Sequence, residues 1–413
     1  MMYAAIMGYG TIGSGVAEIL EGSREKVAKG AGQEIALKYV LDLREFPDSP
    51  VAGRIIHDFE KIEKDPQVRL VVEAMGGLNP AYPFVKACLN AGKHVATSNK
   101  ALVAAHGTEL LAIAREKGVN FFFEASVGGG IPIIRTLYRC LMGEEIQEIT
   151  GILNGTTNYI LTKMEKEGAS FSDVLKEAQE LGYAEKDPEA DIKGYDTCRK
   201  IAILTSLVTG KEVDYQDIYT EGVTTVTDMD FRYAKKLGAS IKLFGTSRME
   251  GEAVHAWVAP VMVGKNHPLY GVGGAYNGIL VKSDKLGTSM YYGSGAGKLP
   301  TASAVVADLI EAAQNEGKNV PIGWNGQRLA LAGMDTFDCR YFVRVAGDAA
   351  GKKGQVEDML GKGETIVLEG ADEFAVVTPQ MSEREFKERA IKLEQACRNL
   401  NEEGIRQMIR TEL

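Results

Sequence analysis

Cysteine and histidine are scarce in this sequence, and their scarcity excludes whole classes of site. Five cysteines are spread over 413 residues without a C-x-x-C pair, so neither a disulfide framework nor a thiolate metal site is indicated. The five histidines show no metal-ligand spacing with these cysteines. We therefore expect reduced, mostly buried thiols and a cytoplasmic protein.

Excess positive charge and long apolar runs are also missing. The chain has 47 basic and 56 acidic residues, a net charge of −9, which disfavours binding to nucleic acid or to a lipid surface. No apolar run is long enough to span a bilayer, and we expect no signal peptide because no basic leader precedes the first apolar run. With 45% hydrophobic and 25% charged residues, the composition is that of a globular protein with two or three cores.

Residues 2–125 alternate short apolar runs with longer helical patterns, which is typical of β-α-β units around a parallel sheet. Apolar residues recur at three- and four-residue spacing in segments 11–21, 82–91 and 107–117, as they do in amphipathic helices. These patterns predict a doubly wound, Rossmann-type α/β domain at residues 1–143. The expected strands are residues 3–7, 36–41, 69–74, 94–97 and 119–123.

The pattern changes after residue 143. Strand-like runs separated by helices predict an α+β substrate and dimerisation domain at residues 144–299; these runs are 146–153, 253–263 and 276–283. A helix at 302–314, entered through a glycine-rich loop, would complete the first domain within about residues 300–330.

The tail, residues 335–413, predicts a third, small α+β domain. Its pattern is a strand, a helix, a pair of strands and a long charged helix, at residues 339–345, 355–360, 365–377 and 382–399.

Gly8, Gly10 and Gly13 form a G-x-G-x-x-G motif between an apolar run and a helical pattern. In this context, backbone N–H groups at a helix N-terminus bind a pyrophosphate, so the motif predicts a dinucleotide cofactor rather than a simple tight turn. After the second expected strand, Asp42 could accept a ribose 2′-hydroxyl, whereas Arg44 could pair with a 2′-phosphate. NAD and NADP therefore both stay open.

Two lysines, Lys100 and Lys200, occupy positions where a catalytic side chain could lie. Lys100 follows a strand at the carboxyl edge of the expected sheet, where open α/β sheets bind ligands, although a solvated lysine at a helix start fits equally well. Asp196 and Lys200 are spaced i, i+4 ahead of the apolar residues 201–204, so both could project from one end of a buried helix. By spacing alone, an ordinary helix salt bridge is the simpler interpretation.

Several segments, in order along the chain, resemble the homoserine dehydrogenase family. The most specific is the stretch L-G-Y-A-E-K-D-P-E-A-D-I-K-G-Y-D-T-C-R-K at residues 181–200. The others are 97–103, G-I-L-N-G-T-T-N-Y at 151–159, 267–269 with 277–279, and 295–297 leading to 300–303. The resemblance covers about residues 1–330, and it favours a catalytic role over a salt bridge for Asp196 and Lys200.

The resemblance implies a reversible NAD- or NADP-dependent reduction of L-aspartate 4-semialdehyde to L-homoserine, on the path to threonine, methionine and isoleucine. By position in the matching motifs, Lys200 would donate the proton, and Lys100 would lie beside the nicotinamide and the reacting oxygen. The substrate contacts would be Glu185, Asp191, Asp196 and Thr156. Further cofactor contacts would be Thr11, Ile12, Ser98, Gly182 and Gly297.

Residues 123–132 resemble the monovalent-cation loop of the same family. There the Glu124 side chain and the backbone carbonyls of Val127, Gly129 and Ile131 would bind sodium, an ion that hard oxygen ligands suit. Without the resemblance, the same residues indicate only a glycine-rich helix start.

The tail resembles an ACT regulatory module in the order of its elements, but residues 347–351 lack the usual proline-glycine turn and the module is short. We therefore expect a monofunctional enzyme, a homodimer or higher homo-oligomer, that threonine inhibits weakly or not at all. One rival function is a semialdehyde dehydrogenase that acylates a cysteine, although no cysteine has a matching glycine-rich setting. Another is a non-catalytic, nucleotide-sensing Rossmann protein.

Overall fold

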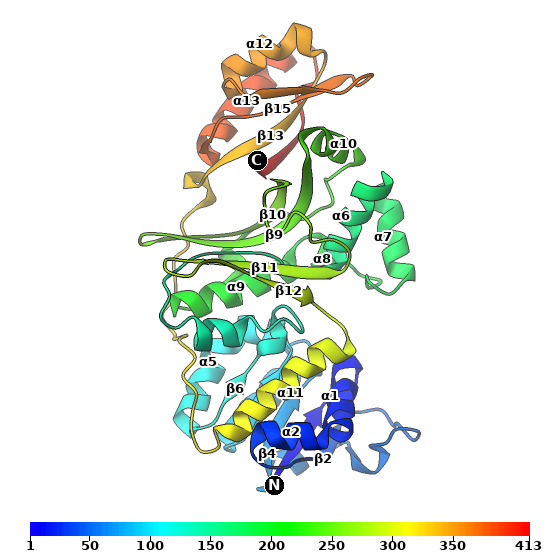
Figure 1. Ribbon diagram of the computed structural model, residues 1–413, viewed down its shortest axis with the longest axis vertical. Helices are drawn as coiled ribbons and strands as arrows, with labels where there is room; N and C mark the ends of the chain where they lie inside the picture. Colours follow the sequence, from blue (N-terminus) through cyan, green and yellow to red (C-terminus); the bar gives the residue numbers. More distant parts are fainter. The chain divides into compact units, whose positions relative to one another are not determined.

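The computed structural model describes all 413 residues, which fold into two compact units. Each unit is assembled from segments that are distant in the sequence (Figure 1). The first unit contains Met1–Ile146, Arg199–Asp217 and Lys282–Ala330, and the second contains Gln147–Cys198, Ile218–Val281 and Leu331–Leu413. The sequence predicted three domains with separate functions, at residues 1–143 with 300–330, 144–299 and 335–413. That assignment of functions stays a prediction.

A six-stranded parallel sheet forms the centre of the first unit, in the order β3-β2-β1-β4-β5-β6. Strands β1, β4 and β5 are almost wholly buried because helices cover both faces, as is usual for parallel sheets. The strand order reverses between β1 and β4, where doubly wound sheets bind their ligands. The strands are β1 (Met2–Met7), β2 (Ile35–Leu41), β3 (Ile55–Ile56), β4 (Val68–Glu73), β5 (His94–Thr97) and β6 (Phe121–Phe122).

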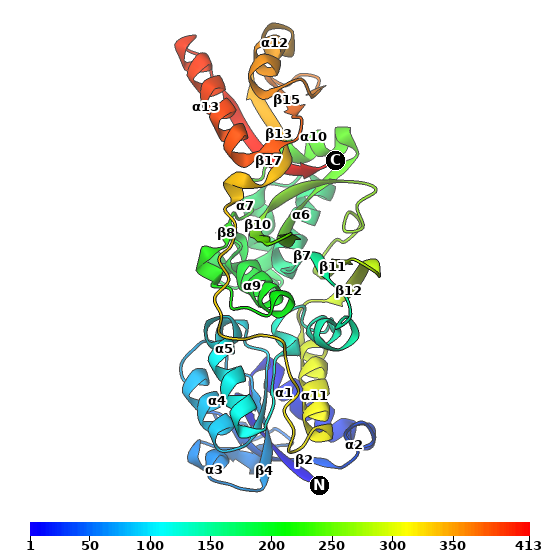
Figure 2. The ribbon, with the colours of Figure 1, turned by 90° about the vertical axis from the view of Figure 1, so that its left-hand side faces the viewer.

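Two groups of helices cover this sheet. Helices α1, α2 and α11 pack together on one face, while α3, α4 and α5 lie on the other (Figure 2). The contact between α1 and α11 is close, since a Cβ on Gly15 would lie 2.9 Å from the Lys298 carbonyl oxygen. The helices are α1 (Thr11–Gly22), α2 (Arg24–Ala31), α3 (Glu60–Glu63), α4 (Ala81–Asn90), α5 (Lys100–Lys117) and α11 (Lys298–Gln314).

A mixed sheet runs through the second unit in the order β11-β7-β9-β10-β17-β13-β15-β14. Its centre is the antiparallel hairpin of β9 and β10, paired from Ala239↔Gly264 to Glu250↔Ala253. The strands before the tail are β7 (Ile146–Ile152), β8 (Tyr219–Thr220), β9 (Ala239–Glu250), β10 (Ala253–Gly264) and β11 (Tyr276–Ser283). The helices are α6 (Gly155–Glu167), α7 (Phe171–Glu180), α8 (Glu189–Ile192) and α10 (Asp228–Leu237). Strand β12 (Gly287–Ser294) belongs to the first unit, as does α9 (Tyr195–Thr209) from Arg199 onward.

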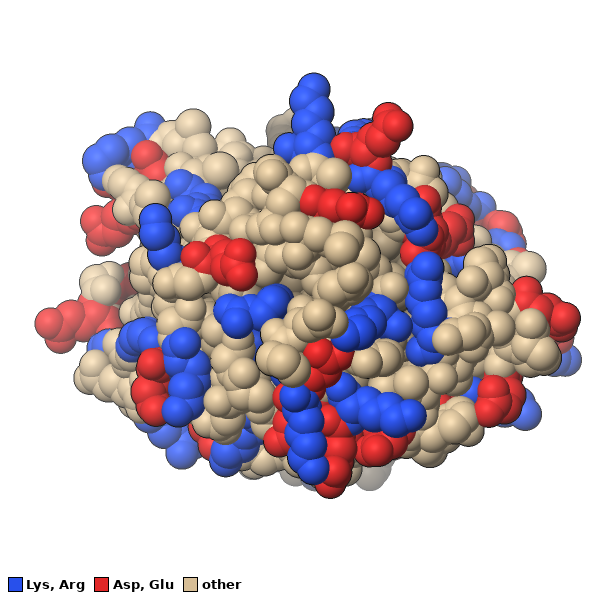
Figure 3. All heavy atoms as spheres, turned by 90° about the horizontal axis from the view of Figure 1, so that it is seen from below, with Lys and Arg blue, Asp and Glu red and all other residues tan.

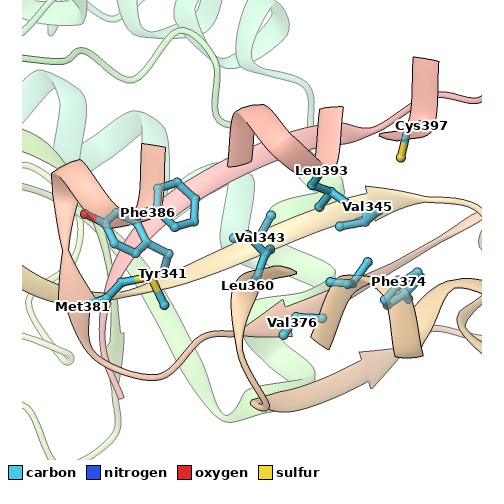
Figure 4. Packing of buried hydrophobic residues seen from close by; sticks show 11 residues of the cluster. Tyr341, Val343, Val345, Leu360, Phe374, Val376, Met381, Phe386, Leu393 and Cys397 are labelled. Atoms are coloured by element: carbon cyan, nitrogen blue, oxygen red, sulfur yellow. The ribbon is translucent and has the colours of Figure 1, made fainter. Parts of the chain in front are cut away.

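The tail continues this sheet. Strand β17 pairs in parallel with β10 and antiparallel with β13, so the tail shares one sheet with β7, β9, β10 and β11. Its own core includes the stacked rings of Tyr341 and Phe386 at one end and Phe374 at the other, with Val343 and Leu393 between them (Figure 4). The elements are β13 (Asp338–Ala346), α12 (Ala349–Leu360), β14 (Glu364–Val367), β15 (Glu373–Val377), β16 (Met381–Ser382), α13 (Glu383–Asn399) and β17 (Ile405–Glu412).

Buried ion pairs join the tail to the rest of the second unit. The Arg344 guanidinium, on β13, donates hydrogen bonds to Asp230 of α10 at 2.7 Å and to Glu373 of β15 at 2.9 Å. Arg410, on β17, donates to Glu383 at 2.8 Å and to Glu221 at 2.9 Å. Buried charges of this kind are stable only when they are paired, so these contacts tie the tail to its neighbours.

The face of the molecule seen from below carries charges of both signs, and its Lys and Arg side chains lie among Asp and Glu rather than in one basic patch (Figure 3). None of the helices is both long enough and apolar enough to cross a membrane.

Candidate active site

The glycines of the G-x-G-x-x-G motif lie between β1 and α1 in different steric surroundings. Gly8 has a φ of +96°, and a Cβ there would lie 2.8 Å from the backbone of Ala74, at the end of β4. A Cβ on Gly13 would lie 1.9 Å from the Gly8 carbonyl oxygen, whereas nothing lies within 4 Å of one on Gly10. The loop is therefore packed at Gly8 and Gly13 and open at Gly10, where a pyrophosphate can approach the N–H groups of the first turn of α1, which begins at Thr11 and Ile12.

A cavity of about 470 Å³ lies beside this loop, at the point where the strand order reverses. One side is polar and contains Asp42 and Arg44, which follow β2. The rest of the lining is largely apolar and includes Leu41, Leu43, Phe59, Ala74, Met75, Pro80 and Phe84. A mostly apolar cavity with a few polar groups at one end suits the adenosine of a dinucleotide.

Asp42 and Arg44 form an ion pair at the polar end of the cavity. The Asp42 carboxylate accepts hydrogen bonds from the backbone N–H of Tyr9 at 2.8 Å and of Arg44 at 3.0 Å. The Arg44 guanidinium donates two more, both at 3.0 Å. The hydrogen-bonded Arg44 side chain is the largest cause that holds the pKa of Asp42 well below its usual range.

Lys100 begins α5, and a buried hydrogen-bond network fixes the loop before it. The Thr97 hydroxyl donates to the Glu73 carboxylate at 2.5 Å and accepts from the Asn99 N–H at 2.9 Å. Asn99 caps α5 by accepting from the Leu102 N–H at 3.1 Å. The carboxyl ends of β4 and β5 thus hold Ser98 and Lys100 at the edge of the sheet predicted to bind ligand.

Asp196 and Lys200 lie on α9, one turn apart and both buried, with exposed fractions of 3% and 8%. The helix continues into the apolar residues Ile201, Ala202, Ile203 and Leu204, all buried. Burial of a lysine and an aspartate is costly unless polar groups surround them, so this end of α9 is a polar site within an apolar helix.

Asn154 brings two of the predicted substrate contacts together. Its side-chain N–H₂ group donates to the carboxylates of Asp191 and Asp196, each at 2.8 Å. Its oxygen caps α6 by accepting from the Thr157 N–H at 2.8 Å, which fixes the direction of the amide. Two carboxylates converging on one amide make an acidic position suited to an ammonium group. The sequence interpretation missed Asn154 as a functional residue, although it lies in the G-I-L-N-G-T-T-N-Y segment.

The remaining predicted substrate contacts lie near the loop after α7. The Thr156 hydroxyl donates to the Tyr183 carbonyl at 2.7 Å, and Gly182 before it has a φ of +75°. The Gln179 side chain donates to the Glu185 carbonyl at 3.0 Å, while the Glu185 residue itself is exposed. The loop is therefore held by its backbone, and the Glu185 carboxylate is available to a ligand.

Glu124 is buried, with 2% of its surface exposed, and its burial raises its pKa. Its carboxylate accepts from the backbone N–H groups of Ile134 at 2.8 Å and Arg135 at 2.7 Å. The Arg135 guanidinium in turn pairs with Asp308 and Glu311 of α11. The start of the predicted cation loop is thus braced against the returning helix.

The carbonyl donors predicted for that loop lie in the following residues. Val127, Gly129 and Ile131 are all buried, and a Cβ on Gly129 would lie 2.4 Å from the Gly295 carbonyl oxygen. Gly297, two residues later, is the N-cap of α11 with a φ of +118°. The predicted cation loop therefore packs directly on the loop that holds the predicted cofactor contact Gly297.

Comparison with known proteins supports one family along nearly the whole chain. The profile described as "Homoserine dehydrogenase, NAD binding domain" matches residues 8–124, and that described as "Homoserine dehydrogenase" matches residues 132–310. The homoserine dehydrogenase of Bacillus subtilis is 36% identical over 401 residues, which is 93% of this chain and 92% of that protein. The chain belongs to the homoserine dehydrogenase family.

Solved homoserine dehydrogenases share the fold. The crystal structure of the Thiobacillus denitrificans homoserine dehydrogenase has a TM-score of 0.91 and 34% identity, and the match covers 100% of this chain and 98% of that one. A hyperthermophilic archaeal homoserine dehydrogenase solved in complex with NADPH has a TM-score of 0.63 and 27% identity over 75% of this chain and 97% of that one. The matched NAD binding domain and the family support an NAD(P)-linked oxidoreductase over a non-catalytic nucleotide sensor.

Proposed function

We propose that this homoserine dehydrogenase catalyses the reversible reduction of L-aspartate 4-semialdehyde to L-homoserine, on the path to threonine, methionine and isoleucine. The observation that carries the proposal is the Asn154 amide, which donates at 2.8 Å each to Asp191 of α8 and to Asp196 of α9, the helix that also bears Lys200. An acidic position beside a buried lysine suits a substrate with an ammonium group and a reacting oxygen. Glu185 and Thr156 complete the substrate contacts.

The two lysines have different roles in this proposal. When bound, NAD(P) supplies or accepts the hydride. Lys200 donates the proton to the oxygen of the aldehyde as it becomes an alcohol, and Lys100, at the start of α5, places a second positive charge near that oxygen. Positive charge fixed before the reaction stabilises a developing alkoxide without reorganisation.

The cofactor contacts follow from the open and closed parts of the glycine loop. Gly8 and Gly13 shape the turn, while Gly10, Thr11 and Ile12 present backbone groups to the pyrophosphate. Ser98, Gly182 and Gly297 are the further contacts, as is Lys100. We propose that both NAD and NADP are used, since Asp42 suits a ribose hydroxyl and Arg44 a phosphate.

Replacement of Arg44 by alanine tests the cofactor proposal. Arg44→Ala should raise KM for NADPH by roughly tenfold, the effect of one lost charge-assisted contact, and leave KM for NADH unchanged or lower. Steady-state rates with both cofactors measure the effect. An equal rise for both would show that Arg44 does not contact the phosphate.

We propose that Glu124 and the carbonyls of Val127, Gly129 and Ile131 bind a sodium ion. Glu124 uses two of its four lone-pair positions on backbone N–H groups, which leaves two for a cation beside the Arg135 guanidinium at 4.0 Å. All four donors are oxygens, as a hard monovalent ion requires.

The sodium proposal predicts a salt-specific stability. Sodium chloride should raise the free energy of unfolding of the wild type by roughly 1–3 kcal/mol over choline chloride of equal ionic strength. Glu124→Gln should abolish this difference, which thermal unfolding in the two salts measures. Glu116→Gln, at an exposed position of α5, is the control and should keep it. A sodium effect that survives in Glu124→Gln would place the ion elsewhere.

We propose a cytoplasmic homo-oligomer, at least a dimer, whose ACT-like tail gives little inhibition by threonine. All five cysteines are free, which supports a reducing compartment. The lack of a proline-glycine turn at residues 347–351 supports weak feedback.

One assay tests the activity itself. NADPH oxidation with aspartate semialdehyde should yield homoserine, whereas a semialdehyde dehydrogenase that acylates a cysteine would interconvert the semialdehyde and an acyl product. Burial raises the pKa of Cys88 to about 12 and of Cys339 to about 11, which is the opposite of what a nucleophilic thiol needs. Absence of homoserine among the products would contradict the proposal.

A further inference from the structure

His57, which the sequence interpretation did not single out, lines the same cavity as Asp42 and Arg44. It comes directly after β3, the strand that pairs with β2 and forms the edge of the sheet. The polar end of the cavity therefore contains two side chains that can carry positive charge and one carboxylate. The opposite wall is apolar, with the rings of Phe59 and Phe84 stacked at a centroid distance of 3.9 Å.

Arg44 neutralises Asp42 in this arrangement. The guanidinium lies side-on against the carboxylate with two hydrogen bonds of 3.0 Å, while the Arg44 side chain is still 63% exposed. An unpaired Asp42 would repel a 2′-phosphate, so a cavity that accepts one needs this cover. A second cation beside Arg44 would strengthen the attraction of the site for a phosphate.

Both ring nitrogens of His57 face hydrogen-bond acceptors. Nδ1 lies 2.7 Å from the Asp42 carbonyl oxygen, and Nε2 lies 2.7 Å from the Glu45 carboxylate. An imidazole with two acceptors is best satisfied as the imidazolium, which donates from both nitrogens. The Asp42 carbonyl and then Glu45 raise the pKa of His57, and the negative charge of the Asp42 carboxylate adds to them. Arg44 is the other cationic group at this end of the cavity.

Glu45 does not close the site to a ligand. Its side chain is 75% exposed, and that of His57 is 48% exposed, so this ion pair is weak and a more highly charged anion can replace the carboxylate. The Asp42 carbonyl keeps the ring in place when Glu45 leaves, because it contacts the other nitrogen.

We propose that His57 is the second cationic ligand of the 2′-phosphate, beside Arg44, and that its protonation makes the preference for NADPH over NADH fall as the pH rises. This inference rests on the proposed function only in that the cavity takes the adenosine of the cofactor. Because the folded pKa is raised, the imidazolium and its contribution are present at low pH and are lost as the pH passes through that pKa. NADH, which lacks the phosphate, gains nothing from the ring.

Calorimetric binding of adenosine 2′,5′-bisphosphate and adenosine 5′-monophosphate tests the inference without catalysis. At about pH 6, His57→Gln should lower the affinity for the bisphosphate by roughly five- to tenfold relative to the wild type. At about pH 8.5 it should lower that affinity by less than about twofold. The phosphate itself has a pKa near 6, and comparing the variant with the wild type at each pH removes that contribution. The monophosphate should bind both proteins alike.

Two further variants complete the design. His57→Lys keeps the cation at both pH values, so its preference for the bisphosphate should not weaken as the wild type's does. Leu43→Ala removes an apolar side chain of the cavity lining that is 91% exposed. It should lower the affinities for both nucleotides by the same factor. A His57→Gln effect equal at both pH values, or equal for both nucleotides, would overturn the inference. Failure of the wild type to prefer the bisphosphate would do the same, while homoserine formation would still support the proposed function.

Discussion

Lys200→Ala is expected to lower kcat for aspartate semialdehyde by roughly 10²- to 10⁴-fold, the usual contribution of a general acid. An alcohol is a very weak acid, so the oxygen that receives charge from the hydride needs a proton at once. NADPH should bind the variant normally, since Lys200 lies on α9 and outside the dinucleotide loop. Steady-state rates and a fluorescence titration of NADPH measure the two quantities.

Controls separate chemistry from folding in this experiment. Lys200 is buried, so alanine would leave a cavity, and Lys200→Met, which nearly keeps the volume, should lose kcat equally. Lys117→Ala, at the exposed end of α5, should be as active as the wild type. Near-normal kcat in either Lys200 variant would show that Lys200 is not the general acid, and the salt-bridge interpretation of Asp196 and Lys200 would then hold.

The role of Lys100 is tested with the same assay. Lys100→Ala should lower kcat and also raise KM for NADPH, because it borders the nicotinamide in the proposed site. If the two lysines act on one oxygen, the double variant should lose less than the product of the single losses.

Arg344→Met should reduce the stability of the second unit by about 3–5 kcal/mol, the usual cost of breaking a buried ion pair. Its partners are almost fully buried, with side-chain exposures of 0% for Asp230 and 1% for Glu373. Methionine fills much of the volume but leaves Asp230 without its arginine and Glu373 with Arg406 as its remaining cation, at 3.2 Å. Urea-induced unfolding measures the change.

The chain offers a specific reporter and a matched control for this measurement. Of its two tryptophans, Trp257 belongs to the second unit and Trp324 to the first, so a Trp324→Phe background makes fluorescence report on the second unit alone. Arg384→Met breaks an exposed pair with Asp335 and should cost less than about 1 kcal/mol. If the two arginine variants lowered the free energy of unfolding equally, the buried Arg344 ion pairs would contribute no more to stability than the exposed Arg384 pair.

Local patterns predicted the elements that depend on local sequence. Helix α1 and the strand before it were expected from the glycine motif and occur within one residue of the predicted bounds. Helix α12 was expected only at 355–360 but begins at Ala349. Its first half was not predicted because Gly351 and Gly354 have low helix propensity and weaken the helical pattern there. The expected strand at 119–123 is only Phe121–Phe122, since the chain turns into a 3₁₀ helix at Glu124.

Features that depend on distant residues escaped the sequence. The twelve-residue strand β9 was not predicted, and its first nine residues are all buried, so it lacks the alternation of a half-buried strand. Strand β17 has mixed polar character and owes its place to β10 and β13. Asn154 and His57 became candidates for the same reason, because only the fold brings them to Asp191 and Arg44. The family resemblance, by contrast, was carried by contiguous motifs and could be seen directly.

The position of β17 has a consequence for folding. Residues Ile405–Glu412 come long after β10 in the sequence, yet they lie between β10 and β13 and hydrogen-bond to both, as at Thr411 to the Met262 carbonyl. Until β17 has been made and has paired, Val261–Val263 of β10 therefore lack their partner strand, and unpaired edges invite association with other chains. A premature stop codon before β17 would leave that edge permanently open.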